Sequence, residues 1–91
     1  MGRTEIITGR PLPKEFTGRM FTVFVYYAMY WSVEEIAEVV CMSTHSVKMD
    51  LRKIYLALDV EERAAAEQIA WLEGIFQKED FEGIEWRGAA E

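Results

Sequence analysis

Residues 31–60 of the chain, WSVEEIAEVVCMSTHSVKMDLRKIYLALDV, decide the fold. Their apolar residues recur at helical spacing in two groups: Val33, Ile36, Ala37 and Val40, then Val47, Leu51, Ile54 and Leu58. Each group forms one stripe along one side of a helix, so each helix has one face to bury. The short segment between them, residues 41–43, is too brief for anything but a turn. The stretch therefore predicts a helix-turn-helix.

Polar residues at the helix starts support this interpretation. Ser43 is a good N-cap for a helix running from about Thr44 to Leu58. Ser32 precedes Glu35 by three residues, which is the spacing of a capping box at the start of the preceding helix. Glu34, Glu35 and their neighbour Glu38 place negative charge near that helix start, where the helix dipole favours it. These acids are therefore interpreted as helix-stabilising rather than catalytic.

The same residues resemble the DNA-binding domain of LuxR-type (GerE-like) transcription regulators. The matching positions are Ser32, Glu35, Ile36, Ala37, Ser43, Val47, Lys48, Leu51, Ile54, Leu58, Val60, Arg63 and Ala66, and upstream Phe16 to Arg19, Val23, Phe24 and Ala28. The resemblance covers about Phe16 to Trp71. Region 4 of bacterial sigma factors has a similar pattern and is the near rival.

The resemblance implies an all-α fold of four helices, in which the third helix enters a groove of double-stranded DNA. The DNA-binding candidates at its start and along its outer side are Thr44, His45, Ser46, Lys48, Met49, Arg52 and Lys53. Asp50 does not suit this role if it faces the duplex, because it then repels phosphate unless it accepts a hydrogen bond from a cytosine amine or pairs with Lys53 or Lys14. Cys41 stands where the family has glycine, so we expect a wider turn and a buried cysteine.

Composition sets limits on the function. Ninety-one residues make one small domain, and the net charge of −6 is unusual for a DNA-binding protein. The charge is uneven: residues 59–91 carry ten acids and three bases, whereas residues 43–58 carry three bases and one acid. One cysteine and one histidine predict no disulfide, no metal site and no cofactor, and no apolar run is long enough for a membrane span. These features suit a cytoplasmic protein that is not an enzyme.

The first helix, expected at about Gly18 to Tyr30, is apolar nearly all round, which indicates burial on more than one side. The N-terminal arm, the C-terminal tail, a second copy of the chain or another protein could cover it. The fourth helix, expected at about Glu61 to Gln77, forms the dimer contact in LuxR-type domains. The candidates for a dimer or partner interface are Phe21, Val25, Met29, Gln68, Trp71, Leu72 and Ile75.

Three segments are therefore expected: an arm at residues 1–15, the helix-turn-helix domain at 16–77, and an acidic aromatic tail at 78–91. Arg3 and Arg10 of the arm could contact DNA, although a solvated arm is the simpler interpretation. The tail is either partly disordered, or folded back on the first helix, or placed over the third helix as a DNA mimic.

The favoured function is a small DNA-binding transcription regulator that acts as a homodimer, of a kind that would suit a phage or mobile element. The alternative is a helix-turn-helix scaffold that binds a protein of the transcription machinery or another regulator. The apolar first helix or the acidic tail would then supply the contact. The net charge, Asp50 and Met49 favour the alternative, whereas the family resemblance favours DNA.

Overall fold

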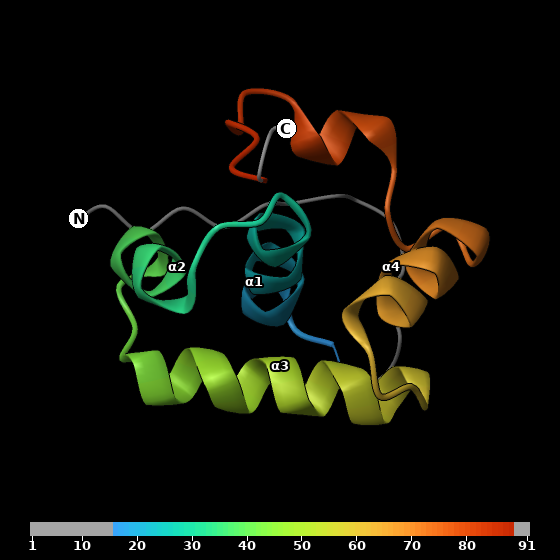
Figure 1. Ribbon diagram of the computed structural model, residues 1–91, viewed down its shortest axis with the longest axis horizontal. Coiled ribbons are helices and arrows are strands. Elements are labelled where there is room, and N and C mark those ends of the chain that lie inside the picture. The colour runs from blue at the N-terminus through green and yellow to red at the C-terminus, as the bar shows by residue number, and fades with distance from the viewer. Residues whose placement is uncertain (1–15, 89–91) are drawn as a thin grey trace.

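The computed structural model describes residues 16–88, and this part of the chain is all-helical (Figure 1). Four α-helices follow one another: α1 (Gly18–Ala28), α2 (Val33–Val40), α3 (Thr44–Leu58) and α4 (Arg63–Leu72). A single 3-10 turn, η1 (Lys78–Phe81), lies in the tail. The expected bounds of the third helix are confirmed. Residues 1–15, with Arg3, Arg10 and Lys14, lie outside the described residues.

The helix starts are fixed by the caps that the sequence indicates. The Thr17 hydroxyl accepts a hydrogen bond from the Met20 N–H at 3.1 Å, which begins α1. The Ser32 hydroxyl accepts from the Glu35 N–H at 3.1 Å, and the Glu35 carboxylate accepts from the Ser32 N–H at 2.9 Å. This is the complete capping box. Each cap satisfies a backbone donor that the helix itself leaves unpaired, so the starts of α1 and α2 are well defined.

The fourth helix is shorter than expected, because it ends at Leu72 rather than near Gln77. Gly74 takes a left-handed conformation with φ of 78°, which suits glycine and ends the helix there. The chain then turns back, so that Ile75 and Phe76 enter the core. The apolar pattern continues past the helix end, which is why periodicity alone overestimated its length.

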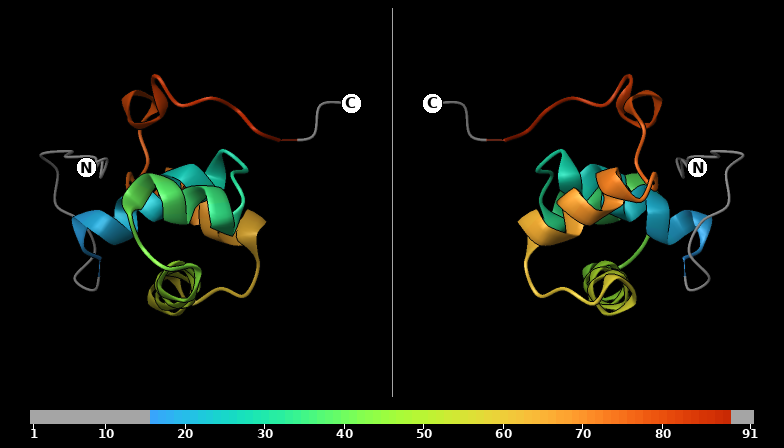
Figure 2. Two further views of the ribbon diagram at one scale, coloured as in Figure 1. Left: turned by 90° about the vertical axis from the view of Figure 1, so that its left-hand side faces the viewer. Right: turned by 90° about the vertical axis from the view of Figure 1, so that its right-hand side faces the viewer.

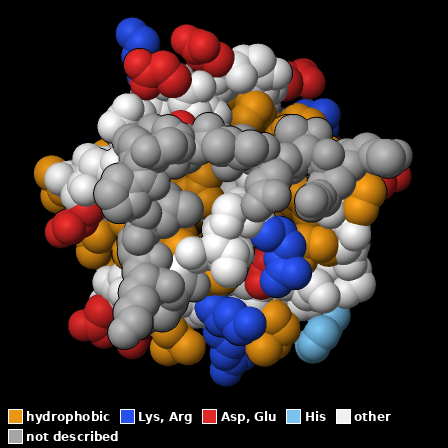
Figure 3. Space-filling model, turned by 180° about the vertical axis from the view of Figure 1, so that it is seen from behind, with side chains coloured by type: hydrophobic (Ala, Val, Ile, Leu, Met, Phe, Trp, Pro, Cys, Tyr) orange, Lys and Arg blue, Asp and Glu red, His pale blue; other side chains and the backbone are white. Residues whose placement is uncertain are grey.

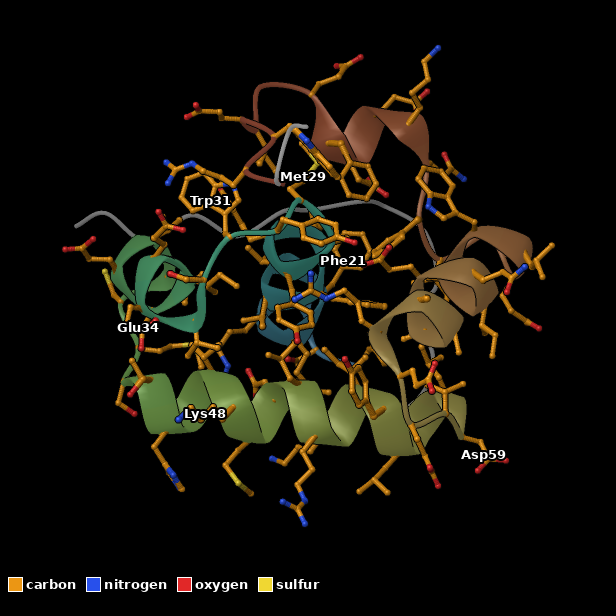
Figure 4. All side chains as sticks on the ribbon, in the orientation of Figure 1. Phe21, Met29, Trp31, Glu34, Lys48 and Asp59 are labelled. Atoms are coloured by element: carbon orange, nitrogen blue, oxygen red, sulfur yellow. The ribbon has the colours of Figure 1, made fainter. Side chains whose placement is uncertain are left out.

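The core lies between α3 on one side and α1, α2 and α4 on the other (Figures 1 and 2). It consists of apolar side chains from all four helices, from the residue before the cap of α1 and from the segment after α4: Phe16, Met20, Phe21, Val23, Phe24, Val25, Ile36, Ala37, Val40, Val47, Leu51, Ile54, Ala66, Ala70, Ile75 and Phe76. Figure 4 shows Phe21 inside this region, between α1 and α4. Removal of this apolar surface from water is the main force that holds the helices together.

The apolar first helix is covered by the chain itself. Phe21 and Val25 are completely buried, so their expected role in a dimer or partner interface is wrong. The Phe76 ring lies 4.6 Å from the Phe24 ring and 6.2 Å from the Phe21 ring, centroid to centroid. The sequence did not decide whether the chain itself or a partner covers this helix. The structure shows that Phe76 of the same chain covers it.

The tail folds back over the C-terminal end of α1, on the side of the molecule opposite α3 (Figures 1 and 2). The Trp31 indole N–H donates to the Glu85 carbonyl at 2.8 Å, and the Arg87 N–H donates to the Met29 carbonyl at 2.8 Å. The expectation that the tail folds back on the first helix is confirmed. The alternative expectation, that the tail lies over α3 as a DNA mimic, is wrong. Residues 78–88 belong to the folded domain.

Within residues 16–88, no helix is long and apolar enough to cross a membrane.

Candidate nucleic-acid interface

The outer side of α3 carries most of the expected DNA-binding residues. Val47, Asp50, Leu51 and Ile54 face inward and are buried. The exposed positions, which follow helical spacing along the other side, are Thr44, His45, Lys48, Met49, Arg52, Lys53 and Leu56. Figure 4 shows side chains projecting from α3 away from the other helices. The structure thus places six of the seven candidates on one accessible surface, which we call the α3 outer face.

Ser46 is the exception. It is half-buried, and its hydroxyl accepts a hydrogen bond from the Ser43 hydroxyl at 3.1 Å. The Ser46 N–H in turn donates to the Ser43 hydroxyl at 3.1 Å, which is the N-cap of α3. Ser46 therefore helps to fix the start of the helix, while Thr44 and His45 in the same turn remain exposed.

Asp50 does not face outward, and its partner among the described residues is Arg19 rather than Lys53. The expected alternative partner, Lys14, lies outside the described residues. Its side chain is buried, and its two carboxylate oxygens each accept a hydrogen bond of 3.0 Å from the guanidinium of Arg19. Arg19 lies in the first turn of α1 and is half exposed. The one acid of α3 is thus neutralised and removed from the α3 outer face, which leaves Lys48, Arg52 and Lys53 as its charged residues.

Figure 3 shows lysine and arginine side chains along the edge of the molecule where α3 runs, with hydrophobic side chains beside them. Met49 and Leu56 supply apolar surface on the α3 outer face and are 38% and 73% exposed. Glu34 and Glu38 of α2 are exposed as well, and Figure 4 places Glu34 near the start of α3. The basic surface is therefore local, and it is bounded by acidic charge at one end.

The turn between α2 and α3 is tight, not wide. Cys41 takes the left-handed conformation with φ of 58° and ψ of 48°, which a glycine would adopt without strain. The Cys41 side chain is exposed, so the expectation of a buried cysteine is wrong. Tyr30, in the turn after α1, likewise has a positive φ of 69°. Both turns therefore use a backbone conformation that favours glycine, although neither residue is glycine.

The remaining interface candidates separate into exposed and buried residues. Gln68, Trp71 and Leu72 lie on the surface of α4, and Leu72 is 78% exposed. Met29 is half-buried beneath the tail, and Ile75 is buried in the core, so Ile75 is not available to a partner. The exposed part of α4, at Gln68 and Leu72, is therefore the surface that a second copy could reach.

Two functional residues escaped the sequence analysis. Arg19 was noted only as part of the helix start, and nothing local indicates that its partner lies 31 residues away. Leu56 could have been found, because it lies four residues after Arg52 and seven after Met49 and so continues the exposed stripe. Within residues 16–88 there is no group of three or more His, Cys, Asp or Glu side chains placed to hold a metal ion.

No family model, no curated protein and no solved structure matches this chain.

Proposed function

We propose that the chain is a small DNA-binding transcription regulator that uses α3 of a LuxR-type helix-turn-helix to contact double-stranded DNA. The single observation that carries this proposal is the state of Asp50. Because Arg19 neutralises it in the interior, the α3 outer face presents Lys48, Arg52 and Lys53 without an acid among them. Cations on one side of an exposed helix are what phosphate contacts require.

The arrangement of the helices supports the same proposal. Three residues, Cys41 to Ser43, separate α2 from α3, and α3 lies along the outside of the molecule over its whole length (Figure 1). In a helix-turn-helix the second helix enters the major groove with its N-terminal residues against the bases. Thr44, His45 and Lys48 occupy that position and are exposed. Lys48 and Arg52 would reach phosphate or a guanine edge.

Fluorescence anisotropy against a random-sequence duplex, titrated with salt, tests the proposal. The wild type should bind, with log K falling linearly as log salt rises, because each neutralised phosphate releases counterions. The variant Lys48→Ala/Arg52→Ala should bind more weakly. Its salt slope should be smaller by about 0.9 for each lost phosphate contact. Equal slopes for the two proteins would contradict a role for α3.

A matched control distinguishes binding through the α3 outer face from an effect of the protein's net charge. Lys78→Ala removes the same charge as Lys48→Ala, but Lys78 lies in the tail, on the side opposite α3 (Figure 1). Lys48→Ala should weaken binding, whereas Lys78→Ala should leave both the affinity and the salt slope unchanged. If the two single variants behave alike, binding reflects net charge and not the α3 outer face.

We propose further that the regulator is a homodimer through α4. Gln68 and Leu72 are four residues apart, so they share one face of the helix, and both are exposed. Leu72→Asp should shift the wild-type sedimentation coefficient from that of a dimer to that of a monomer. A wild type that sediments as a monomer at micromolar concentration would refute the dimer.

One observation favours a second function, the binding of another regulator or a protein of the transcription machinery. Met49 and Leu56 give the α3 outer face an apolar component, and exposed apolar surface of this kind is typical of protein interfaces. This alternative predicts negligible DNA affinity even at low salt and a stoichiometric protein complex. Leu56→Ser, which removes the apolar side chain without adding charge, should weaken that complex, whereas it should leave DNA binding by the basic residues of this face largely intact.

A further inference from the structure

We propose that a pocket between the end of α1, α4 and the tail binds a small organic ammonium ion. The pocket has a volume of about 450 Å³ and is lined chiefly by Met29, Tyr30, Glu67, Trp71, Phe81 and Trp86. Its lining residues belong to the end of α1, to α4 and to the tail, and none of them belongs to α3. The tail runs on the side of the molecule opposite α3 (Figure 1). This site is separate from the proposed DNA contact.

The walls of the pocket are aromatic. Trp71 of α4 and Phe81 of the tail are stacked, with ring centroids 5.5 Å apart and an angle of 25° between the rings. Tyr30 and Trp86 contact each other edge to face, with centroids 5.0 Å apart. These rings come from three different parts of the chain, and Tyr30, Trp71 and Trp86 each keep about half of their surface exposed. Electron-rich ring faces around a cavity attract organic cations.

The Glu67 carboxylate lines the pocket, and one of its two oxygens has no partner among the described residues. Glu67 Oε2 is buried and has no hydrogen-bond partner among the residues that the structure describes. A buried carboxylate oxygen that has lost its water is costly unless a donor replaces that water. Burial raises the pKa of Glu67, and the nearby positive charge of Arg63 only partly opposes this effect.

Arg63 does not satisfy Glu67. Its guanidinium carbon lies 4.0 Å from the centroid of the Tyr27 ring and 4.4 Å from that of the Tyr30 ring, so the group is held by these two rings. An ammonium ion with at least one N–H would donate to the Glu67 carboxylate that lines the pocket, while its charge and apolar body contact the aromatic walls. This combination selects a primary or secondary amine over a quaternary one, because a quaternary ion has no donor.

The size of the pocket agrees with a small ligand, since sites for such molecules have volumes of about 300–1,000 Å³. Lys78 also lines the pocket and is exposed. Its positive charge opposes a cation, so its removal should strengthen binding. Removal of the Glu67 charge should therefore weaken ammonium binding, whereas removal of the Lys78 charge should strengthen it. A purely apolar cavity would not show this difference.

Isothermal titration calorimetry with 2-phenylethylammonium tests the proposal, with 2-phenylethanol as the uncharged ligand of similar shape. The wild type should bind the ammonium ion saturably, and the alcohol at least about tenfold more weakly, which corresponds to about 1.4 kcal/mol. Equal binding of the two ligands, or no saturation below about 10 mM, would overturn the proposal, because even small ligands reach such affinities in a fitting site.

Two variants complete the test. Glu67→Gln preserves the shape of the side chain and should weaken ammonium binding about tenfold while binding of the alcohol is unchanged. Lys78→Gln should strengthen ammonium binding several-fold. Circular dichroism and thermal unfolding confirm that each variant is folded before titration. An unchanged ammonium affinity in folded Glu67→Gln would refute the role of Glu67 and with it the proposed ligand class.

Discussion

Arg19 and Asp50 tie the first turn of α1 to the middle of α3 through two parallel hydrogen bonds, Nε to Oδ2 and Nη2 to Oδ1, each of 3.0 Å. This two-point geometry fixes the orientation of both side chains. The side chain of Asp50 is 2% exposed and that of Arg19 is 48% exposed. One ion pair thus positions the proposed recognition helix on the core and keeps negative charge away from its outer face.

The two partners of this ion pair should not be equally important for stability. Arg19→Met leaves a buried carboxylate without its donors and should lower the free energy of unfolding by about 2 kcal/mol. Asp50→Asn should cost about 1 kcal/mol, because the released guanidinium is half exposed and can be hydrated. Urea unfolding at neutral pH measures both. The double variant Arg19→Met/Asp50→Asn should be more stable than Arg19→Met, since a neutral amide costs less to bury. A double variant that is no more stable than Arg19→Met would contradict this account.

The left-handed turn at Cys41 predicts a stabilising substitution. Cys41→Gly should raise the free energy of unfolding by about 1 kcal/mol, because glycine adopts positive φ without the clash of a Cβ atom. The exposed cysteine side chain contributes little burial that could be lost. Cys41→Ala is the matched control, since it removes the thiol but keeps the Cβ atom. Thermal unfolding should show a gain for glycine only, and an equal gain for alanine would point to the thiol as the cause.

Local signals in the sequence were sufficient to predict the helices. Ser32 and Ser43 cap their helices as expected, because a cap depends on residues only three positions apart. Thr17 caps α1 with the same spacing. The buried stripes of α2 and α3 also follow directly from periodicity. The class of fold could therefore be predicted over residues 16–72, even though the resemblance to LuxR-type domains stays a proposal.

Long-range contacts could not be predicted in the same way. The partner of Asp50 lies 31 residues away, and the residues that cover α1 come from beyond a glycine that ends α4. The acidic composition of the tail suggested disorder, but its aromatic residues pack on the domain: Phe81 lies 5.1 Å from the Phe76 ring. The pocket beside α4 depends on this tail, so no single segment of sequence indicates it.

The packing of the tail predicts that its removal destabilises the domain. Deletion of residues 78–91 should lower the free energy of unfolding by about 3 kcal/mol, comparable with the loss of one large aromatic side chain from a core. It removes Phe81 from Trp71 and Phe76, and it removes the Arg87 side chain, whose guanidinium carbon lies 4.0 Å from the centroid of the Trp31 ring. Urea unfolding followed by tryptophan fluorescence measures the loss.

The control for this deletion tests whether lost charge or lost packing causes the fall in the free energy of unfolding. Glu79 and Glu82 are exposed, so Glu79→Gln/Glu82→Gln removes two negative charges without removing aromatic contacts. This variant should unfold at the wild-type urea concentration. It should also bind DNA with the wild-type affinity, because the tail lies opposite α3 (Figure 2). A marked gain in DNA affinity would instead show that the acidic tail competes with DNA.

The burial of Glu67 predicts a pH-dependent difference between the wild type and Glu67→Gln. Burial raises the pKa of Glu67 in the folded state above its ordinary value of 4.5. The folded state therefore retains the proton more readily than the unfolded state, and stability falls as pH rises from 4.5 through the folded pKa. Above that pKa the ionised carboxylate disfavours folding, and Glu67→Gln should melt at a higher temperature than the wild type at pH 7. Well below pH 4.5 the carboxyl is protonated in both states, so the advantage of glutamine should vanish there. Melting temperatures of both proteins from about pH 3 to about pH 8 measure this convergence. A constant gap across the range would mean that ionisation of Glu67 does not affect folding.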